Sequence, residues 1–331
     1  MISLKATLIA TVAILGLLIL LLIRELVDLL LARVPASQKT VHTGKPDQTP
    51  STNNPHFIPR VIWSYWHTTP TPEFIAKCQV NWRRFAPDHE LRLIHKNTIT
   101  EWLGKGEILG EFSQLPPFRQ ADWLRLKLLA EYGGIWIDAS TLLTQNLDWV
   151  HQLRVKNNSE YVGFYIDRFT TRPDKPIVEN WFMAAVPQSA FIIALAREFD
   201  QAIELGESAY LEKLNKTGRL NEIVQGLNHA DQLYLIMHVA AAVILDKSEK
   251  DFRLSLIKAE DSALGFHAAL KWRKRHLFAR LALTPCPDQL PCIIKLRGGD
   301  RRIFEQGLAR GWICKGSALT RLLSPTEQTA K

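Results

Sequence analysis

Several signatures that would assign this chain to a common protein class are missing from it. It has no G-x-G-x-x-G turn, no phosphate-binding P-loop and no G-x-S-x-G elbow, which argues against a nicotinamide-type oxidoreductase, a P-loop phosphotransferase and a serine hydrolase. No zinc-ligand spacing, RNA-binding signature or heptad seam occurs, so its excess of 41 basic over 33 acidic side chains does not indicate nucleic acid as a partner. An anionic lipid or a nucleoside diphosphate also suits that net charge of +8.

Cysteine is scarce, with four residues in 331. That number is too small for a disulfide scaffold in a chain of this length. Cys286 and Cys292 are close enough in sequence to pair in an oxidising compartment, but we expect ordinary thiols. A composition that is 47% hydrophobic and 22% charged is typical of a globular protein with one large domain or two smaller ones.

One long hydrophobic run is present near the amino terminus. Ala6 to Ile23 contains no charge and would form a helix of about 27 Å, close to the roughly 30 Å of a bilayer core. A signal peptide is the alternative, but its apolar region should be shorter. We therefore expect residues 1–34 to be a retained single-pass anchor. Basic residues after the run favour a cytoplasmic carboxyl-terminal part, as on a bacterial inner membrane. Two N-x-S/T triplets, at Asn157 and Asn215, keep a type II arrangement in a Golgi lumen open.

Three further segments complete the expected organisation. Residues 35–57 are rich in Ser, Thr, Pro and Asn, which predicts a flexible stem. Residues 58–322 alternate strand-like and helix-like stretches, and this predicts an α/β domain with a mainly parallel sheet. Val61 to Tyr65 reads as its buried first strand. Residues 323–331 look like a disordered tail.

The most informative stretch runs from Phe118 to Ser140. Its first part is rich in helix-forming residues, follows Pro116-Pro117 and ends at Gly133-Gly134, so we predict a helix and then a short strand ending at Asp138. Arg119, Asp122 and Arg125 recur at every third position and share one helix face. Charges placed there, with a carboxylate at the end of a strand, suit a ligand crevice in an α/β sheet. A row of surface ion pairs followed by a turn aspartate is the alternative.

The pattern A-D-x-x-R followed by Y-G-G-I-W-I-D-A-S resembles the DXD-type sugar transferases, above all the capsular polysaccharide synthesis group. Yeast outer-chain mannosyltransferases and clostridial glucosylating toxins are more distant relatives of that group. The resemblance implies a GT-A fold and a nucleotide-sugar donor. It assigns Asp122 and Arg125, with Arg119 beside them, to the donor, and Asp138 to a Mn²⁺ or Mg²⁺ ion that bridges the diphosphate. Ser140 replaces the second aspartate of the motif, and a hydroxyl can ligate such an ion without adding charge.

Other candidate contacts are more scattered. Trp66 resembles the base-contacting tryptophan of these transferases, whereas we assign Trp63 to the core. Lys295 lies in a segment that resembles the closing strand of the family, which implies a phosphate contact. Two interpretations remain open for His229 and Asp231: they contact the acceptor or the metal, or Asp231 only caps the helix that follows.

The basic, partly aromatic segment from residue 271 to 281 also has two interpretations: it lies against an anionic membrane, or it is a solvated loop. Together these features predict a membrane-anchored, metal-assisted, retaining glycosyltransferase that extends a surface polysaccharide or another glycan, with a glycan or a lipid-linked molecule as acceptor. The alternative is a protein of the same fold that binds nucleotide-sugar or glycan without catalysis.

Overall fold

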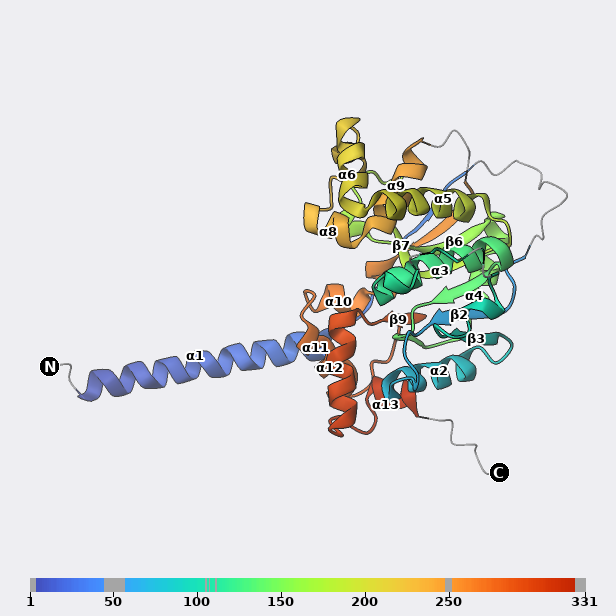
Figure 1. Ribbon diagram of the computed structural model, residues 1–331. Coiled ribbons are helices and arrows are strands. Elements are labelled where there is room, and N and C mark those ends of the chain that lie inside the picture. Colours follow the sequence, from blue (N-terminus) through green and yellow to red (C-terminus); the bar gives the residue numbers. More distant parts are fainter. Residues whose placement is uncertain are drawn as a thin grey trace, which may run out of the picture.

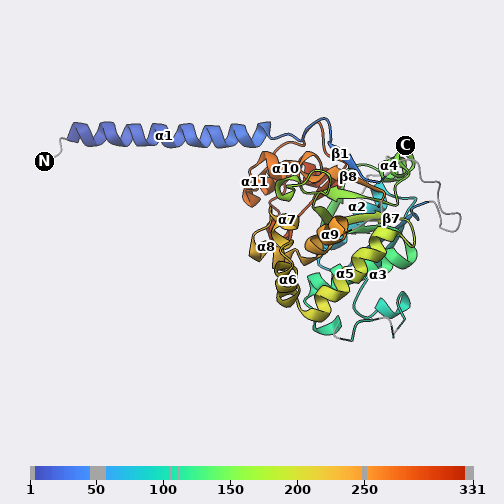
Figure 2. The same cartoon turned by 90° about the horizontal axis from the view of Figure 1, so that it is seen from above.

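A computed structural model describes residues 4–44, 57–104, 106, 108–110, 112–247 and 252–324. Helix α1 (Leu4–Leu31) projects away from a body built of a large sheet with helices packed around it (Figures 1 and 2). The part of this helix from Thr7 to Leu31 is long and apolar enough to cross a membrane, and none of its most apolar stretch is covered by the body. A signal sequence would meet the same criteria of length and composition.

The main sheet has seven strands in the order β1-β8-β6-β7-β4-β2-β3. Their bounds are β1 Thr40–His42, β2 Val61–Tyr65, β3 Glu90–Ile94, β4 Gly134–Ile137, β6 Tyr161–Tyr165, β7 Val178–Ala185 and β8 Leu254–Lys258. Strand β2 is parallel to β3 and β4, and β6 is parallel to β8. Strand β7 is antiparallel to both β4 and β6, and β1 is antiparallel to β8. The α/β class is confirmed, and the sheet is mixed because β7 and β1 run opposite to the other five strands.

Helices cover the sheet on both sides, and their bounds can be given together. They are α2 Glu73–Phe85, α3 Pro117–Tyr132, α4 Asp148–Asn157, α5 Ala190–Leu205, α6 Glu207–Lys216, α7 Leu220–Val224, α8 His229–Tyr234, α9 Ile236–Lys247, α10 Gly265–Ala269, α11 Lys274–Phe278, α12 Gly298–Ala309 and α13 Ala318–Leu323. Five single turns, η1 Ile99–Glu101, η2 Phe112–Gln114, η3 Asp167–Phe169, η4 Ala259–Asp261 and η5 Ala279–Leu283, join them. Helices α3, α5 and α9 pack on one another beside β4 and β7.

The predicted helix-to-strand unit around Asp138 is present. Helix α3 has Pro117 in its first turn and ends at Gly133, which has φ 62° and so a conformation that other residues rarely adopt. A side chain at Gly133 would also come within 2.6 Å of the Pro187 backbone. This tight turn sends the chain directly into β4, and the strand ends one residue before Asp138. The position of Asp138 therefore follows from the local sequence.

A second, two-stranded sheet brings the end of the chain to the same place. Strand β5 (Thr141–Leu143) pairs in antiparallel register with β9 (Ile293–Lys295), and Thr141 lies opposite Lys295. Because β5 begins only three residues after Asp138, this pairing brings Lys295 to the end of β4. Cys286 and Cys292, just before β9, are free thiols as expected.

Part of the predicted stem is folded against the body. Thr40–His42 form the edge strand β1 instead of a flexible segment, because they pair with Ser255–Ile257 of β8. The last turn of α1 and the residues after it also pack on the body: Leu29 and Ala32 are buried, and Val34 contacts Gly265. Residues 45–56 of the stem and 325–331 of the predicted tail lie outside the described residues. Leu323, the first residue of that predicted tail, is buried at the end of α13.

Candidate active site

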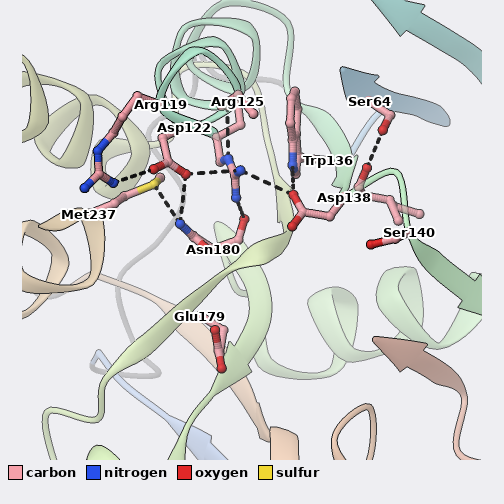
Figure 3. Close-up of polar contacts among 12 residues, drawn as sticks. Ser64, Arg119, Asp122, Arg125, Trp136, Asp138, Ser140, Glu179, Asn180 and Met237 are labelled. Atoms are coloured by element: carbon pink, nitrogen blue, oxygen red, sulfur yellow. Dashed lines mark hydrogen bonds and ion pairs between the residues drawn. The ribbon is translucent and has the colours of Figure 1, made fainter. Parts of the chain in front are cut away.

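Asp122 lies between two buried arginines on α3. Arg119 Nη1 is 2.9 Å from Asp122 Oδ2, and Arg125 Nη2 is 3.1 Å from Asp122 Oδ1 (Figure 3). The three side chains are only 2–8% exposed, so the alternative of a solvated ion-pair row is wrong. Asn180 on β7 donates its amide to Asp122 Oδ1 at 3.0 Å. Buried carboxylates that accept several charged hydrogen bonds are held in one orientation.

Arg119 supports this arrangement from behind. Its Nε donates to Glu207 at 2.5 Å and its Nη2 donates to the carbonyl of Leu233 at 2.6 Å. With its third contact made to Asp122, each of its three guanidinium nitrogens has a partner, and Arg119 is not among the residues that line the cavity described below. It therefore positions Asp122 and does not touch the space beside it.

Asp138 is held by two cations from different parts of the chain. Lys295 Nζ is 2.5 Å from Asp138 Oδ2, and Arg125 Nη2 is 3.3 Å from Oδ1. The indole of Trp136 donates to Oδ1 at 3.0 Å (Figure 3). Burial would raise the pKa of Asp138, but the charges of Lys295 and Arg125 outweigh it and hold the pKa below its usual range. Asp138 is therefore a permanent anion locked between two cations at neutral pH.

These groups face a cavity of about 690 Å³. The sequence-predicted residues on its wall are Trp66, Asp122, Arg125, Asp138, Ser140, Asp231 and Lys295. Arg119 and His229 are not on it, and His229 is exposed at the start of α8. The structure thus brings together seven of the nine candidates, which come from the end of β2, α3, the β4–β5 turn, α8 and β9.

Trp66 lies just beyond the end of β2, as expected for a residue that contacts a ligand from the sheet edge. It is only partly buried, and the guanidinium of Arg301 lies 4.8 Å from its ring centre. Trp63, three residues earlier and within β2, is fully buried. Its indole donates to the carbonyl of Gly133, which confirms it as a core residue. The exposed part of Trp66 therefore offers a flat aromatic surface to the cavity.

The capping interpretation of Asp231 is wrong in detail. Asn228 is the residue that caps α8, because its side-chain oxygen accepts from the Asp231 backbone N–H at 2.9 Å. The Asp231 carboxylate accepts in return from the Asn228 amide at 2.7 Å. The helix expected to follow Asp231 is also interrupted, because α8, which already contains Asp231, ends at Tyr234 and α9 begins at Ile236.

Several cavity residues are not among the site residues predicted from the sequence. Glu179 on β7 is buried and lies 3.1 Å from His238 on α9. Trp272, in a left-handed conformation with φ 61°, has the guanidinium of Arg168 4.5 Å from its ring and that of Arg297 5.1 Å from it. The apolar pattern of β7 was the available signal for Glu179. For Trp272 and Arg297 the only signal was basic and aromatic composition, which does not specify a position.

The residues predicted to hold a divalent cation are engaged in other contacts. The Asp138 carboxylate already pairs with Lys295 and Arg125. The Ser140 hydroxyl donates to the carbonyl of Leu296 at 2.9 Å. Within the described residues, no group of three or more His, Cys, Asp or Glu side chains is placed to hold a metal ion. One neutralised carboxylate and one engaged hydroxyl are a poor donor set for Mn²⁺ or Mg²⁺, which are bound through several free oxygens. In this arrangement the site does not fit a divalent cation.

Comparison with known proteins places this site in a family. The chain is 25% identical over 193 residues to the O-glycosyltransferase braB of Annulohypoxylon truncatum, a match that covers 49% of this chain and 44% of that protein. The chain thus spans less than half the length of this curated relative. Two solved structures are also similar. PaToxG Glycosyltransferase is 15% identical with a TM-score of 0.32, over 67% of this chain and 86% of its own.

The second structure is the UDP-bound glycosyltransferase domain from the YGT toxin, which is 10% identical with a TM-score of 0.31, over 56% of this chain and 68% of its own. At these scores the two structural likenesses carry no argument. The family described as "Capsular polysaccharide synthesis protein" matches residues 35–202, about half of the chain, and this stretch includes Asp122, Arg125 and Asp138. This match confirms the resemblance seen in the sequence, and the chain belongs to the capsular polysaccharide synthesis protein family.

Proposed function

We propose that the chain is a glycosyltransferase with a GT-A-like domain that transfers a sugar from a nucleotide-sugar donor to a glycan acceptor. Family membership supports this, as does the similarity to the O-glycosyltransferase braB. The observation that carries it is the fixed network of Asp122, Arg125, Asp138 and Lys295 on the wall of one cavity. A network of buried, mutually paired charges presents hydrogen-bonding groups in set directions, as the orientation of a polyhydroxylated ligand requires.

The donor would span this cavity from Trp66 to Asp122. The nucleobase would stack on the exposed surface of Trp66, a contact worth about 1–3 kcal/mol by analogy with other base-stacking sites. Asp122 and Arg125 would then bind hydroxyls of the sugar or the ribose. Both side chains are rigidly held, so little entropy is lost when the donor binds.

The diphosphate leaving group gains negative charge as the glycosidic bond breaks. We assign its neutralisation to Lys295, with Arg297 and Arg301 beside it on the same cavity wall. These residues come from the end of β9 and the start of α12, and Lys295 is fixed by its pair with Asp138. The family resemblance implies a Mn²⁺ or Mg²⁺ ion in this role and retention of anomeric configuration. Because the donor set at Asp138 and Ser140 does not fit a metal, we build no step on one.

The acceptor and the membrane belong to the same proposal. We propose that α1 is a retained single-pass anchor and that the domain acts on the cytoplasmic face of a bacterial inner membrane. The acceptor would be a growing surface or capsular polysaccharide, free or lipid-linked. Asp231 and Glu179, which also line the cavity, would contact it.

The test uses the full chain in detergent, because β1 and the end of α1 are part of the folded body. Nucleoside diphosphate release would be measured for a panel of UDP- and GDP-sugars, in Mn²⁺ and in a chelator. We expect release from one donor in both conditions, and loss of release in Asp138→Asn. Release that stops in the chelator would overturn the assignment of the leaving group to Lys295 and its neighbours. Donor binding without release, even with acceptor glycans added, would indicate a non-catalytic binding protein, which the engaged Ser140 hydroxyl also permits.

A further inference from the structure

A second hollow of about 410 Å³ adjoins the cavity and is strongly basic. Its described lining residues are Tyr234, Lys274, Arg297, Gly298, Gly299, Arg301 and Arg302. Four of these seven residues are cations, and none is acidic. The larger cavity, by contrast, carries four acidic side chains among its lining residues. We call this space the basic hollow.

The positive charge of the basic hollow is largely uncompensated. Arg297 is paired with the buried Asp300, through contacts of 2.8 and 3.1 Å. Arg301 has only a distant pair, 3.8 Å from Glu305. Lys274 and Arg302 have no acidic partner among the residues that the structure describes. At least two full positive charges therefore face the hollow without a counter-ion from the described part of the chain, and such a site attracts an anion.

The backbone allows the cations to come close. Gly299, in the first turn of α12, lies so near Lys274 that an added Cβ would be 2.6 Å from the ammonium nitrogen. At Gly298 an added Cβ would meet nothing within 4 Å, so the backbone there faces open space. A small anion can thus reach both the ammonium group and the backbone of α12.

The basic hollow lies at the membrane-proximal side of the body. Lys274 begins α11. Its neighbours in sequence, Arg273 and His276, contact the carboxylate of Glu25 in the last third of α1, at 2.6 Å and 2.8 Å. Glu25 comes two residues after the uncharged run of α1. Figures 1 and 2 show α11 at the point where α1 leaves the body, on the side towards which α1 projects. If α1 spans a bilayer, the hollow lies near the level of the lipid head groups.

We propose that the basic hollow binds the phosphate or diphosphate group of a lipid-linked acceptor, an inference that rests on the proposed function. The hollow shares Tyr234, Arg297 and Arg301 with the cavity, so a glycan attached to that phosphate could extend directly towards the donor. The lipid chain would remain in the membrane beside α1. Lys295 lines the cavity but not the hollow, whereas Lys274 and Arg302 line the hollow but not the cavity. The donor and acceptor phosphates would thus occupy adjoining sites that share Arg297 and Arg301 and differ in these other cations.

The test compares two ligands on two matched variants of the full chain in phosphatidylcholine nanodiscs. Farnesyl diphosphate stands for the lipid-linked phosphate, and UDP stands for the donor. Lys274→Ala/Arg302→Ala removes two cations from the hollow, and Lys213→Ala/Arg310→Ala removes two exposed cations elsewhere. We expect the first variant to bind farnesyl diphosphate roughly 10- to 100-fold more weakly, as for lost charged hydrogen bonds, with UDP affinity changed less than about twofold. The control variant should resemble the wild type with both ligands.

Other outcomes separate the possible sources of the anion. Equal weakening of UDP would show that the hollow serves the donor diphosphate and would overturn the proposal. Competition by phosphatidylglycerol as strong as that by farnesyl diphosphate would indicate a site for ordinary lipid head groups and would also overturn the proposal. A complete lack of farnesyl diphosphate binding would overturn it as well. If farnesyl diphosphate binds through Lys274 and Arg302 but UDP never binds, the proposed transferase function fails while the phosphate site stands. Both substituted residues are exposed, and circular dichroism would verify that the variants fold.

Discussion

The α3 wall of the cavity and the wall of the adjoining basic hollow carry charge in opposite ways. On the wall formed by α3 and the end of β4, Asp122 and Asp138 are matched by Arg119, Arg125 and Lys295 at hydrogen-bonding distance. On the wall formed by α11 and the start of α12, cations accumulate and Lys274 and Arg302 lack an acidic partner among the described residues. The first wall is nearly neutral and rigid, whereas the second is positive and open.

This difference indicates separate tasks. A buried network in which charges are paired needs little free energy to persist without a ligand. It suits the orientation of neutral hydroxyl groups, whose contacts depend on direction more than on net charge. An unbalanced positive surface is unfavourable without an anion and therefore gains most from binding phosphate. Lys295 connects the two walls. Its side chain is paired with Asp138 on the first wall, and in the chain it comes two residues before Arg297 on the second. Breaking the balance on one wall should therefore have consequences different from removing charge on the other.

The largest expected effect comes from removing the central anion of the balanced wall. In Asp122→Ala, Arg119 and Arg125 keep charged side chains that are only 2% and 4% exposed, and they lose their shared partner. We expect a loss of about 3–5 kcal/mol in the free energy of unfolding, as for other buried ion pairs that lose one member. Urea denaturation of the full chain in detergent measures it.

The matched control for this prediction is Glu131→Ala, which removes an exposed carboxylate from the same helix. Its effect should stay within about 0.5 kcal/mol. If Asp122→Ala were as stable as this control, the α3 wall would not be a mutually dependent network, and the contrast between the walls would lose its basis.

The balanced wall is also the part that the sequence predicts best. Arg119, Asp122 and Arg125 lie within seven residues of one helix, so helix geometry alone places them together. The strand after Gly134 fixes Asp138 in the same way. The length of this unit and the turn at Gly133-Gly134 follow from local composition, and the structure has both. What the local sequence does not contain is burial, and this is why a surface ion-pair row remained an alternative.

The positive wall depends on contacts between distant parts of the chain. Lys295 was expected near phosphate, but its pairing with Asp138 depends on the β5–β9 register across more than 150 residues. Lys274 and Arg302 come together only because α11 packs against α12. The basic segment from residue 271 was recognised, yet its composition fits a solvated loop equally well. Similarly, the apolar pattern of β7 marks Glu179 only as part of a buried strand, and its contact with His238 on α9 joins residues 59 positions apart in the chain.

A smaller effect is expected from the residue that joins the walls. Lys295→Met should reduce turnover about 10²- to 10³-fold, the usual cost of losing one group that stabilises a leaving-group charge. Asp138 would keep Arg125 and Trp136, so the fold should survive. The measurement is the rate of nucleoside diphosphate release with whichever donor the panel of UDP- and GDP-sugars identifies. Lys213→Met, an exposed lysine on α6, is the matched control and should turn over at the wild-type rate. Similar rates in both variants would remove Lys295 from the reaction.

The smallest effect, and the sharpest test of the link between the walls, is a shift in pH dependence. The pKa of Asp138 is held below its usual range against the opposing effect of burial, with Lys295 as the leading cause of the lowering. A carboxylate with a lowered pKa in the folded state stays charged through the ordinary carboxylate range, and its contribution is lost only as the pH falls through the lowered value. Wild-type donor binding should therefore persist as the pH drops towards 4. In Lys295→Met the pKa of Asp138 should rise, so that binding declines at a higher pH. Calorimetric titration of the protein with the nucleotide, repeated from pH 7 to pH 4, would measure both pH profiles. If the two profiles coincide, Arg125 alone keeps Asp138 ionised. The electrostatic balance would then be confined to the α3 wall.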